Sequence, residues 1–533
     1  MRVCFNSSET ANRRQVAMPE PQQPVLDFLA DPPSYGLARD DRVERIDTHC
    51  ASVFLVGERA YKLKRAIRFA YLDFSTLALR EESCRTELAI NRRTAPGIYL
   101  GLHRITREAG GRLAFDGAGE LLDWVIEMRR FEQSALFDRM ADEGRLTIPL
   151  MQELADIIWH FHQSLAPVHE PHGAARFGRV MAGNVGELKR AGADGLLEIA
   201  KIDRLQALGQ DALDAVATLL DRRAAAGLVR RCHGDLHLRN ICLWEGRPTL
   251  FDAIEFSEDL ATIDRLYDLA FLLMDLEFRG ARNFANRVLN RYFDRGEAED
   301  ALAVLPLFMA TRAIIRAHVS ASTAARHGAT AAGRSAREQS RAYLDLALRL
   351  LQPGPARLIA VGGLSGTGKS TLAYELAPQL GGSPGARVLR SDVIRKRLQG
   401  VPPETKLPSE AYRREVSRQV YDALMGDAGQ ALAAGAAVIA DAVFSDPAER
   451  AAIEAVARRT SVEFAGLWLE APAATLEARV RDRRADASDA DLAVLRRQLE
   501  RPTGAMSWAL VDAAGRFADT VANAWRALAS PRV

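Results

Sequence analysis

The chain has 533 residues, more than a single hydrophobic core usually supports, so two or three domains are expected. Its 71 basic and 69 acidic residues give a formal net charge of +2, which argues against a nucleic-acid partner. Five widely spaced cysteines without a C-x-x-C pair exclude a disulfide scaffold and favour a reducing cytoplasm.

The first part of the chain predicts a leader followed by a β-rich region. Residues 1–24 lack the apolar stretch of a signal peptide, and we expect a disordered leader there. No run of about eighteen apolar residues follows, so we expect no membrane-spanning segment. Residues 43–65 predict three strands separated by turns, 80–95 have the apolar spacing of a helix, and 121–131 predict a strand that leads into a connector.

A polar motif, H-G-D-x-x-x-x-N, begins at His233 and contains Asp235 and Asn240. Asp252 follows it after a predicted hairpin of two short strands. In the related kinase loop H-R-D-x-x-x-x-N, the Asp orients the acceptor hydroxyl, while the Asn and a later Asp hold Mg²⁺ against the triphosphate. We therefore expect Asp235 to be catalytic and Asn240 and Asp252 to bind the metal. The alternative is a turn that is merely capped by the Asp and His side chains.

With Gly in place of Arg, this motif resembles the aminoglycoside phosphotransferase and choline kinase branch of the kinase-like superfamily. The resemblance implies a strand lysine that contacts the ATP phosphates and is held by Glu87. Lys62 and Lys64 share one strand face, so the sequence does not choose between them; Lys62 is favoured because Ala-Tyr-Lys resembles V-A-x-K. A solvated lysine face is the alternative. Glu127 and Met128 are expected at the hinge that contacts adenine.

Proline and glycine at residues 351–356 interrupt a long helical region and predict a linker. The linker would separate a kinase-like α+β bilobal domain, residues 25–350, from a second domain, residues 357–533. In the second domain strand and helix patterns alternate, which predicts a parallel-sheet α/β fold. We expect the two domains to fold independently.

The second domain begins with G-x-x-x-x-G-K-[ST] between a predicted strand at 357–363 and a predicted helix at 370–380. The glycines allow backbone N–H groups to turn toward an anion, and the helix N-terminus adds partial positive charge. Lys369 is expected to reach the β/γ-phosphates of ATP and to act in catalysis, and Ser370 to hold Mg²⁺. The nucleotide-binding residues predicted from this P-loop are Gly363, Leu364, Ser365, Gly366, Thr367, Gly368, Lys369, Ser370 and Thr371.

Further polar residues follow the predicted strands of this domain. Asp392 comes at the end of a strand, where parallel sheets face their ligands, and is expected to orient an acceptor hydroxyl. Asp441 ends an apolar strand and is expected in the metal shell. Arg479 and Arg483 lie in an arginine-rich segment that predicts a mobile lid, whose cations neutralise a transferring phosphoryl group. A solvated helix with i,i+4 ion pairs is the alternative.

These elements resemble predicted P-loop kinases related to gluconate, chloramphenicol and polynucleotide kinases. The whole chain resembles a bacterial family in which an aminoglycoside phosphotransferase-like domain is fused to a P-loop kinase-like domain. The resemblance implies a bifunctional, ATP-dependent and Mg²⁺-dependent phosphotransferase that acts on hydroxyl groups of small molecules.

Two other functions stay open. In the first, the N-terminal half is a pseudokinase that senses ATP and gates the C-terminal half; the lack of a G-x-G-x-x-G loop between the first strands favours it, whereas the intact Asp235, Asn240 and Asp252 disfavour it. In the second, the C-terminal half is a polynucleotide-type kinase, for which the arginine clusters give weak support. The fold alone does not identify the acceptor.

Overall fold

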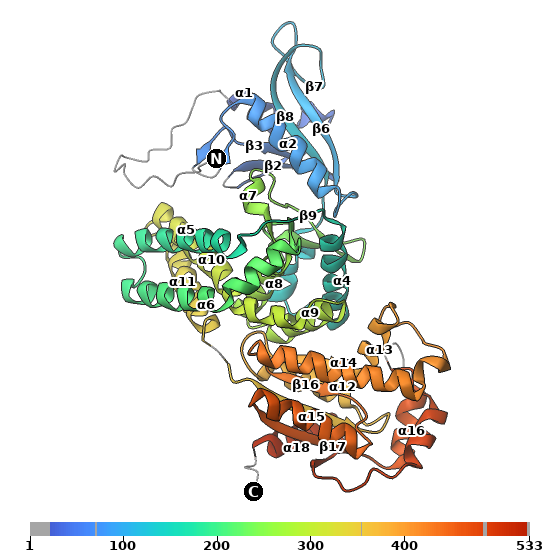
Figure 1. Cartoon of the computed structure of the whole chain (residues 1–533). Helices are drawn as coiled ribbons and strands as arrows, with labels where there is room; N and C mark the ends of the chain where they lie inside the picture. Colours follow the sequence, from blue (N-terminus) through green and yellow to red (C-terminus); the bar gives the residue numbers. More distant parts are fainter. Residues whose placement is uncertain (1–21, 49, 70–71, 353, 483–487, 530–533) are drawn as a thin grey trace. The chain divides into compact units, whose positions relative to one another are not determined.

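The computed structural model of the chain describes residues 22–48, 50–69, 72–352, 354–482 and 488–529 (Figure 1). Most of the predicted leader, and Arg483, lie outside the described residues. Gln23 and Pro24, which the sequence placed in the leader, instead begin helix α1 (Gln23–Ala30). This helix forms because Val25 and Leu29 bury their side chains in a hydrophobic cluster.

The contacts between residues divide the chain into two compact units. The first comprises the residues up to Met140 together with Arg231–Ile263. The second comprises Ala141–Arg230 together with the residues from Asp264 onward, so the predicted linker lies inside it.

The first unit contains a six-stranded antiparallel sheet in the order β1-β2-β3-β8-β6-β7. Its strands are β1 (Glu44–Asp47), β2 (Ala51–Val56), β3 (Arg59–Lys64), β6 (Tyr99–Arg107), β7 (Leu113–Phe115) and β8 (Glu120–Arg129). Three strands thus lie where residues 43–65 predict them. Helix α2 (Leu77–Asn91) packs against β8 and β6 (Figure 1). Along β8, Trp124 and Ile126 belong to a hydrophobic cluster that includes residues of α2, whereas Val125 belongs to a hydrophobic cluster that includes residues of α1. Successive side chains of a strand point to opposite faces of the sheet, which explains this division.

The H-G-D motif is followed by a short antiparallel hairpin. The hairpin consists of β11 (Ile241–Trp244) and β12 (Arg247–Leu250). The short elements before and after it in the chain are β10 (Val229–Arg231), η3 (Leu238–Asn240), α7 (Glu258–Ala261) and β13 (Thr262–Asp264). Two further short strands, β4 (Arg68–Phe69) and β5 (Leu72–Asp73), pair with each other. The second strand of the hairpin ends at Leu250, so Asp252 follows the hairpin as the sequence predicts. Asp252 adopts a φ of 60°, in the left-handed region, which takes the chain out of the extended conformation.

The first part of the second unit is helical. Its long helices are α4 (Ile148–Ser164), α5 (Gly173–Ala193), α6 (Ile199–Ala225), α8 (Arg265–Phe278), α9 (Arg282–Asp294), α10 (Leu305–His327) and α11 (Ala331–Leu350). The segment Glu299–His327 is long and apolar enough to cross a membrane, with a mean hydropathy of 1.5. However, 67% of its most apolar window is buried inside the structure, as in a core helix.

The second part of this unit is a parallel five-stranded sheet in the order β15-β16-β14-β17-β18. Its strands are β14 (Arg357–Gly363), β15 (Arg387–Arg390), β16 (Val438–Asp441), β17 (Glu463–Glu470) and β18 (Ala509–Asp512). Its helices are α12 (Lys369–Leu376), α13 (Ser391–Leu398), α14 (Arg414–Ala433), α15 (Pro447–Thr460), α16 (Ala473–Asp482), α17 (Leu492–Leu499) and α18 (Phe517–Ala529). The predicted helix at 370–380 is shorter, because the chain turns into a 3₁₀ segment, Ala377–Gln379, that contains Pro378.

Candidate functional site

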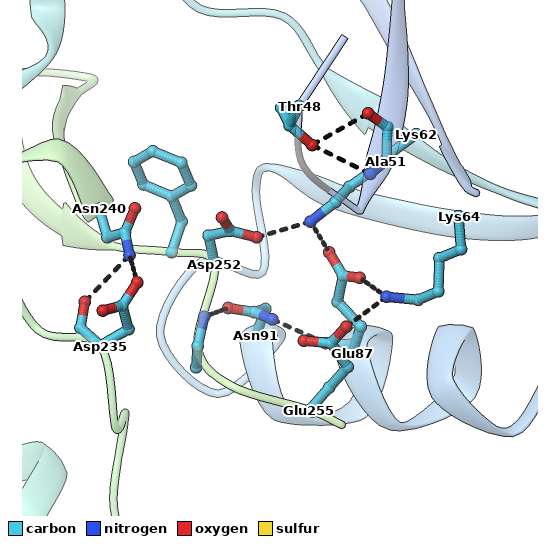
Figure 2. A network of polar contacts seen from close by, with 12 residues as sticks. Thr48, Ala51, Lys62, Lys64, Glu87, Asn91, Asp235, Asn240, Asp252 and Glu255 are labelled. Atoms are coloured by element: carbon cyan, nitrogen blue, oxygen red, sulfur yellow. Dashed lines mark hydrogen bonds and ion pairs between the residues drawn. The ribbon is translucent and has the colours of Figure 1, made fainter. Parts of the chain in front are cut away.

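Lys62 is the centre of the polar network in the first unit (Figure 2). From strand β3, its Nζ donates to Oε1 of Glu87 on α2 at 2.7 Å and to Oδ1 of Asp252 at 2.6 Å. Glu87 is fully buried, whereas the side chain of Asp252 is 43% exposed. The network therefore connects a strand, a helix and the loop after β12, and it leaves one carboxylate open to a ligand.

Lys64 takes a different place from Lys62, although both lie on one face of β3. Its Nζ donates to Oε2 of Glu87 at 2.6 Å and also to Glu255, and its side chain is almost completely buried. Burial alone would raise the pKa of Glu87, but the two lysine ammonium groups lower it to about 2. Glu87 thus stays a carboxylate shared by two lysines. Lys64 belongs to the buried side of this network, and Lys62 is the lysine that reaches Asp252.

Replacing Lys64 by methionine should strongly destabilise the first unit. The change leaves Glu255 buried without its cation, and breaking a buried ion pair costs about 3–5 kcal/mol. Lys62→Met is the matched control, because Glu87 keeps Lys64 and Asp252 has access to water. We expect a clearly smaller loss of unfolding free energy in this control when urea-induced unfolding of the full chain is followed. Equal losses in the two variants would contradict a division between a structural and a ligand-facing lysine.

Asp235 and Asn240 form the second part of this site. Asn240 Nδ2 donates to the backbone oxygen of Asp235 at 2.9 Å and to its Oδ2 at 2.8 Å. The Asp235 side chain is 38% exposed, so its carboxylate is held in place and still accessible. Asp252 is fixed through its backbone, because its N–H donates to Tyr99 Oη at 3.2 Å and the next N–H donates to Asn91 Oδ1 at 2.9 Å. A residue held at positive φ by such contacts is typical of a functional position.

The two residues expected at the adenine-contacting hinge lie near the end of a strand. Glu127 and Met128 lie inside β8, where they pair with Tyr61 and Ala60 of β3 and with residues of β6 on the other side. Their backbone groups lie within the sheet between two strands, and β8 continues to Arg129. The strand thus lies close to the predicted range 121–131, and the connector follows Arg129.

The P-loop lies between β14 and α12, as the sequence predicts. Gly363, Gly366 and Gly368 have positive φ values of 141°, 88° and 88°. A Cβ atom at Gly363 would lie 2.7 Å from the backbone oxygen of Leu469, so the turn requires glycine there. Lys369 Nζ donates to the Leu364 carbonyl oxygen at 3.0 Å, which holds the ammonium group against the loop. Leu364, Ser365, Thr367 and Thr371 belong to this loop and the first turn of α12.

Ser370 and Asp441 meet at the end of the P-loop. Ser370 Oγ donates to Asp441 Oδ2 at 2.5 Å, and Asp441 is buried at the carboxyl end of β16. Burial raises the pKa of Asp441, while Arg390 and Lys369 act in the opposite direction. A hydroxyl and a carboxylate placed together fit a hard cation such as Mg²⁺, which prefers oxygen ligands.

Asp392 lies in the first turn of α13, directly after β15, and is partly buried. Its charge contributes to the raised pKa of Asp441, whose main cause is burial, so the structure brings the two carboxylates into one electrostatic environment.

The sequence did not identify the contact that holds the other end of α13. Lys396 Nζ lies 2.8 Å from Oδ2 of Asp489, which also accepts a hydrogen bond from Tyr412. The sequence signal for it was Asp489 itself, in the Ser-Asp-Ala sequence at 488–490 that follows the predicted lid.

Arg479 lies beside the P-loop, but its contacts are not those that the predicted lid role requires. Its Nη1 donates to the Ala513 carbonyl oxygen at 2.8 Å. It lines a cavity of about 270 Å³ together with Thr367, Gly368, Thr371, Ala513, Gly515, Phe517 and Thr520. Asp392 and Asp441 are not among these lining residues. Arg479 therefore belongs to the wall of a cavity at the P-loop and the first turn of α12.

Comparison with family models matches two separate parts of the chain. Residues 119–305 match the phosphotransferase enzyme family, and residues 358–504 match an AAA domain. The uncharacterized protein Rv2004c of Mycobacterium tuberculosis (strain ATCC 25618 / H37Rv) is 30% identical over 428 residues. This similarity covers 78% of the present chain and 82% of the mycobacterial one.

Solved structures resemble each part. A choline/ethanolamine kinase family protein from Mesorhizobium loti is 12% identical, with a TM-score of 0.36, over 62% of this chain and 98% of its own. A gluconokinase from Sinorhizobium meliloti 1021 is 23% identical, with a TM-score of 0.24, over 33% of this chain and 94% of its own.

Proposed function

This chain belongs to the same family as its mycobacterial relative and joins a phosphotransferase-type, kinase-like domain to a P-loop kinase-like domain, and we propose that each half transfers the γ-phosphoryl group of ATP to a hydroxyl group of a small molecule. The observation that carries the proposal is the contact of Lys62 with both Glu87 and Asp252. It is supported by Ser370 and Asp441, which meet beside a P-loop in the other half.

In the kinase-like half, Lys62 contacts the nucleotide phosphates while Glu87 orients its ammonium group. Asp235 takes the proton of the acceptor hydroxyl as that oxygen bonds to the γ-phosphorus. The bond from phosphorus to the bridging oxygen breaks, and ADP leaves with the electron pair. Asn240 and Asp252 would hold Mg²⁺, because amide and carboxylate oxygens suit it. When bound, Mg²⁺ neutralises charge on the transferring group.

In the P-loop half, the backbone N–H groups of the loop and Lys369 bind the phosphates. Ser370 and Asp441 would hold Mg²⁺ in the same way. Asp392 lies directly after the edge strand β15, and its carboxylate orients the acceptor hydroxyl. The two halves thus supply the same chemistry, positioning and charge neutralisation, from unrelated folds.

The experiment that tests this function is a transfer assay with γ-labelled ATP and a pool of cell metabolites. The full chain carries either Asp235→Asn, to silence the kinase-like half, or Lys369→Ala, to silence the P-loop half. We expect each single variant to label a different set of metabolites and the double variant to label none. Absence of transfer by the unsubstituted chain, with or without Mg²⁺, would contradict the proposal.

Arg479→Ala should weaken ATP binding in the P-loop half more than it slows transfer. The guanidinium lines the cavity at the P-loop, and among the described residues that line this cavity Asp392 and Asp441 do not occur. Loss of the guanidinium therefore affects the binding of ATP in the ground state. We expect the KM for ATP to rise about tenfold with little change in kcat, measured with Asp235→Asn in the background. Arg496→Ala, at an exposed arginine of α17, serves as the control. A fall in kcat at unchanged KM would instead support the lid role that the sequence predicts.

A further inference from the structure

Strand β15 lies at the edge of the parallel sheet, and its free side is covered by side chains of helix α9. The Val388 N–H donates to Asn290 Oδ1 at 2.7 Å. The Ala386 carbonyl oxygen accepts from Asn286 Nδ2 at 3.0 Å and from Asn290 Nδ2 at 3.2 Å. Two asparagines of the kinase-like half therefore replace the missing neighbouring strand of the P-loop half.

Arg387 anchors the same strand by charge. Its side chain is 1% exposed and lies 2.7 Å from Asp294 at the end of α9 and 2.9 Å from Glu299. Its Nη1 also donates to Asn290 Oδ1 at 3.1 Å. A guanidinium buried this deeply needs such partners, because an unpaired buried charge is strongly destabilising. All of these partners belong to the kinase-like half.

The contacting residues of α9 follow the helical repeat. Asn286, Asn290 and Asp294 are four residues apart, so they form one stripe that faces β15. The neighbouring stripe contains Arg287, whose guanidinium lies 3.5 Å from the ring centroid of Tyr374, and Arg291. The contact is thus a continuous helix face and not an isolated ion pair.

Arg291 extends the contact between α9 and the P-loop half beyond β15 and α13, the segment that carries Asp392. It lies 2.6 Å from Asp156 of α4 and 2.7 Å from Glu404, which follows α13. Helix α9 therefore holds the chain at β15, before Asp392, and again at Glu404, after α13. Asp392 lies between these two points of attachment.

We propose that helix α9 of the kinase-like half is a positioning element of the P-loop half, with Asn290 as the residue that sets the placement of β15 and hence of Asp392. This inference rests on the proposed function, because it assigns a role in transfer to the segment that carries Asp392. It also opposes the sequence-based expectation of independent folding: a fragment that begins after the linker loses every partner of Arg387 named above.

Amide hydrogen exchange of the full chain tests the structural part without any acceptor. In Asn290→Ala, Val388 loses its acceptor and Ala386 loses one donor, so the peptide 386–392 should exchange on the order of tenfold faster. Asn184→Ala is the matched control, because it removes amide hydrogen bonds to Val180 and His318 inside the helical region. Unchanged exchange of 386–392 in Asn290→Ala, or the same acceleration in the control, would overturn the proposal.

ATP consumption in the presence of the metabolite pool tests the functional part, with Asp235→Asn in every protein. We expect Asn290→Ala to lower kcat about tenfold with the KM for ATP unchanged, because the P-loop follows β14, whereas Asn290 contacts β15. Asn290→Asp keeps the acceptor for Val388 and should restore most of kcat. A loss of thermal stability without a change in kcat would show a merely structural role and overturn the proposal.

Glu404→Gln provides a second variant whose folding is not at risk, since its side chain is 55% exposed. It should accelerate exchange of residues 400–408 and lower kcat in the same direction as Asn290→Ala. No change in either quantity would count against attachment at this second point. If the unsubstituted chain shows no turnover at all, the proposed function fails, whereas the exchange experiment still decides whether α9 holds β15.

Discussion

Lys369→Ala should reduce ATP turnover by the P-loop half about a hundred- to a thousandfold. The ammonium group, held at 3.0 Å by the Leu364 carbonyl oxygen, is expected to contact the phosphates of bound ATP, and this contact strengthens as charge develops on the transferring group. Removing one such donor costs about 3–4 kcal/mol in the transition state. The assay uses the full chain with Asp235→Asn, so that only this half can turn over. Lys406→Ala removes an exposed lysine of the same domain and should have no effect.

Unchanged turnover in Lys369→Ala would mean that the P-loop does not carry the reaction. A comparable loss in Lys406→Ala would mean that the assay reports net charge and not the site. The two variants change the charge of the chain equally, so only the position of the lysine differs between them.

Asp235→Asn should abolish transfer by the kinase-like half while leaving the affinity for Mg·ATP nearly intact. The substitution keeps the size of the side chain but removes the carboxylate that takes the hydroxyl proton. Asp252→Asn should damage both transfer and binding, because it removes a metal ligand and the ion pair with Lys62. Calorimetric titration with Mg·ATP and the transfer assay, both with Lys369→Ala in the background, measure these effects; Asp211→Asn on α6 is the exposed control.

The same pair of variants separates an enzyme from an ATP sensor. A sensor would tolerate Asp235→Asn, whereas Asp252→Asn would alter the activity of the P-loop half through lost nucleotide binding. Loss of transfer in Asp235→Asn at unchanged Mg·ATP affinity would therefore exclude a sensor without catalysis.

Both sites could be located from the sequence where a motif has fixed spacing. Lys369 and Ser370 are adjacent in the P-loop, and Asn240 follows Asp235 within one loop, so local geometry already brings these groups together. The pairing of Lys62 with Glu87 came from a resemblance and could not be derived from spacing, because a helix packing on a sheet decides it.

Other features depend on contacts between distant residues. Glu255 contacts Lys64 across 191 positions, and Arg387 contacts Asp294 across 93, so no local pattern reveals either pair. The exact end of β8, after Glu127 and Met128, depends on pairing with its neighbours β3 and β6, so the residues of the strand alone do not fix it. The edge position of β15 likewise appears only when the strand order is known.

Calorimetric titration of the full chain with AMP-PNP and Mg²⁺ tests most directly whether both halves bind a nucleotide. We expect two binding events in the unsubstituted chain, one in Lys369→Ala, one in Asp252→Asn and none in the double variant. A single event in the unsubstituted chain, or two events that survive in the double variant, would contradict the claim that this protein has two nucleotide sites.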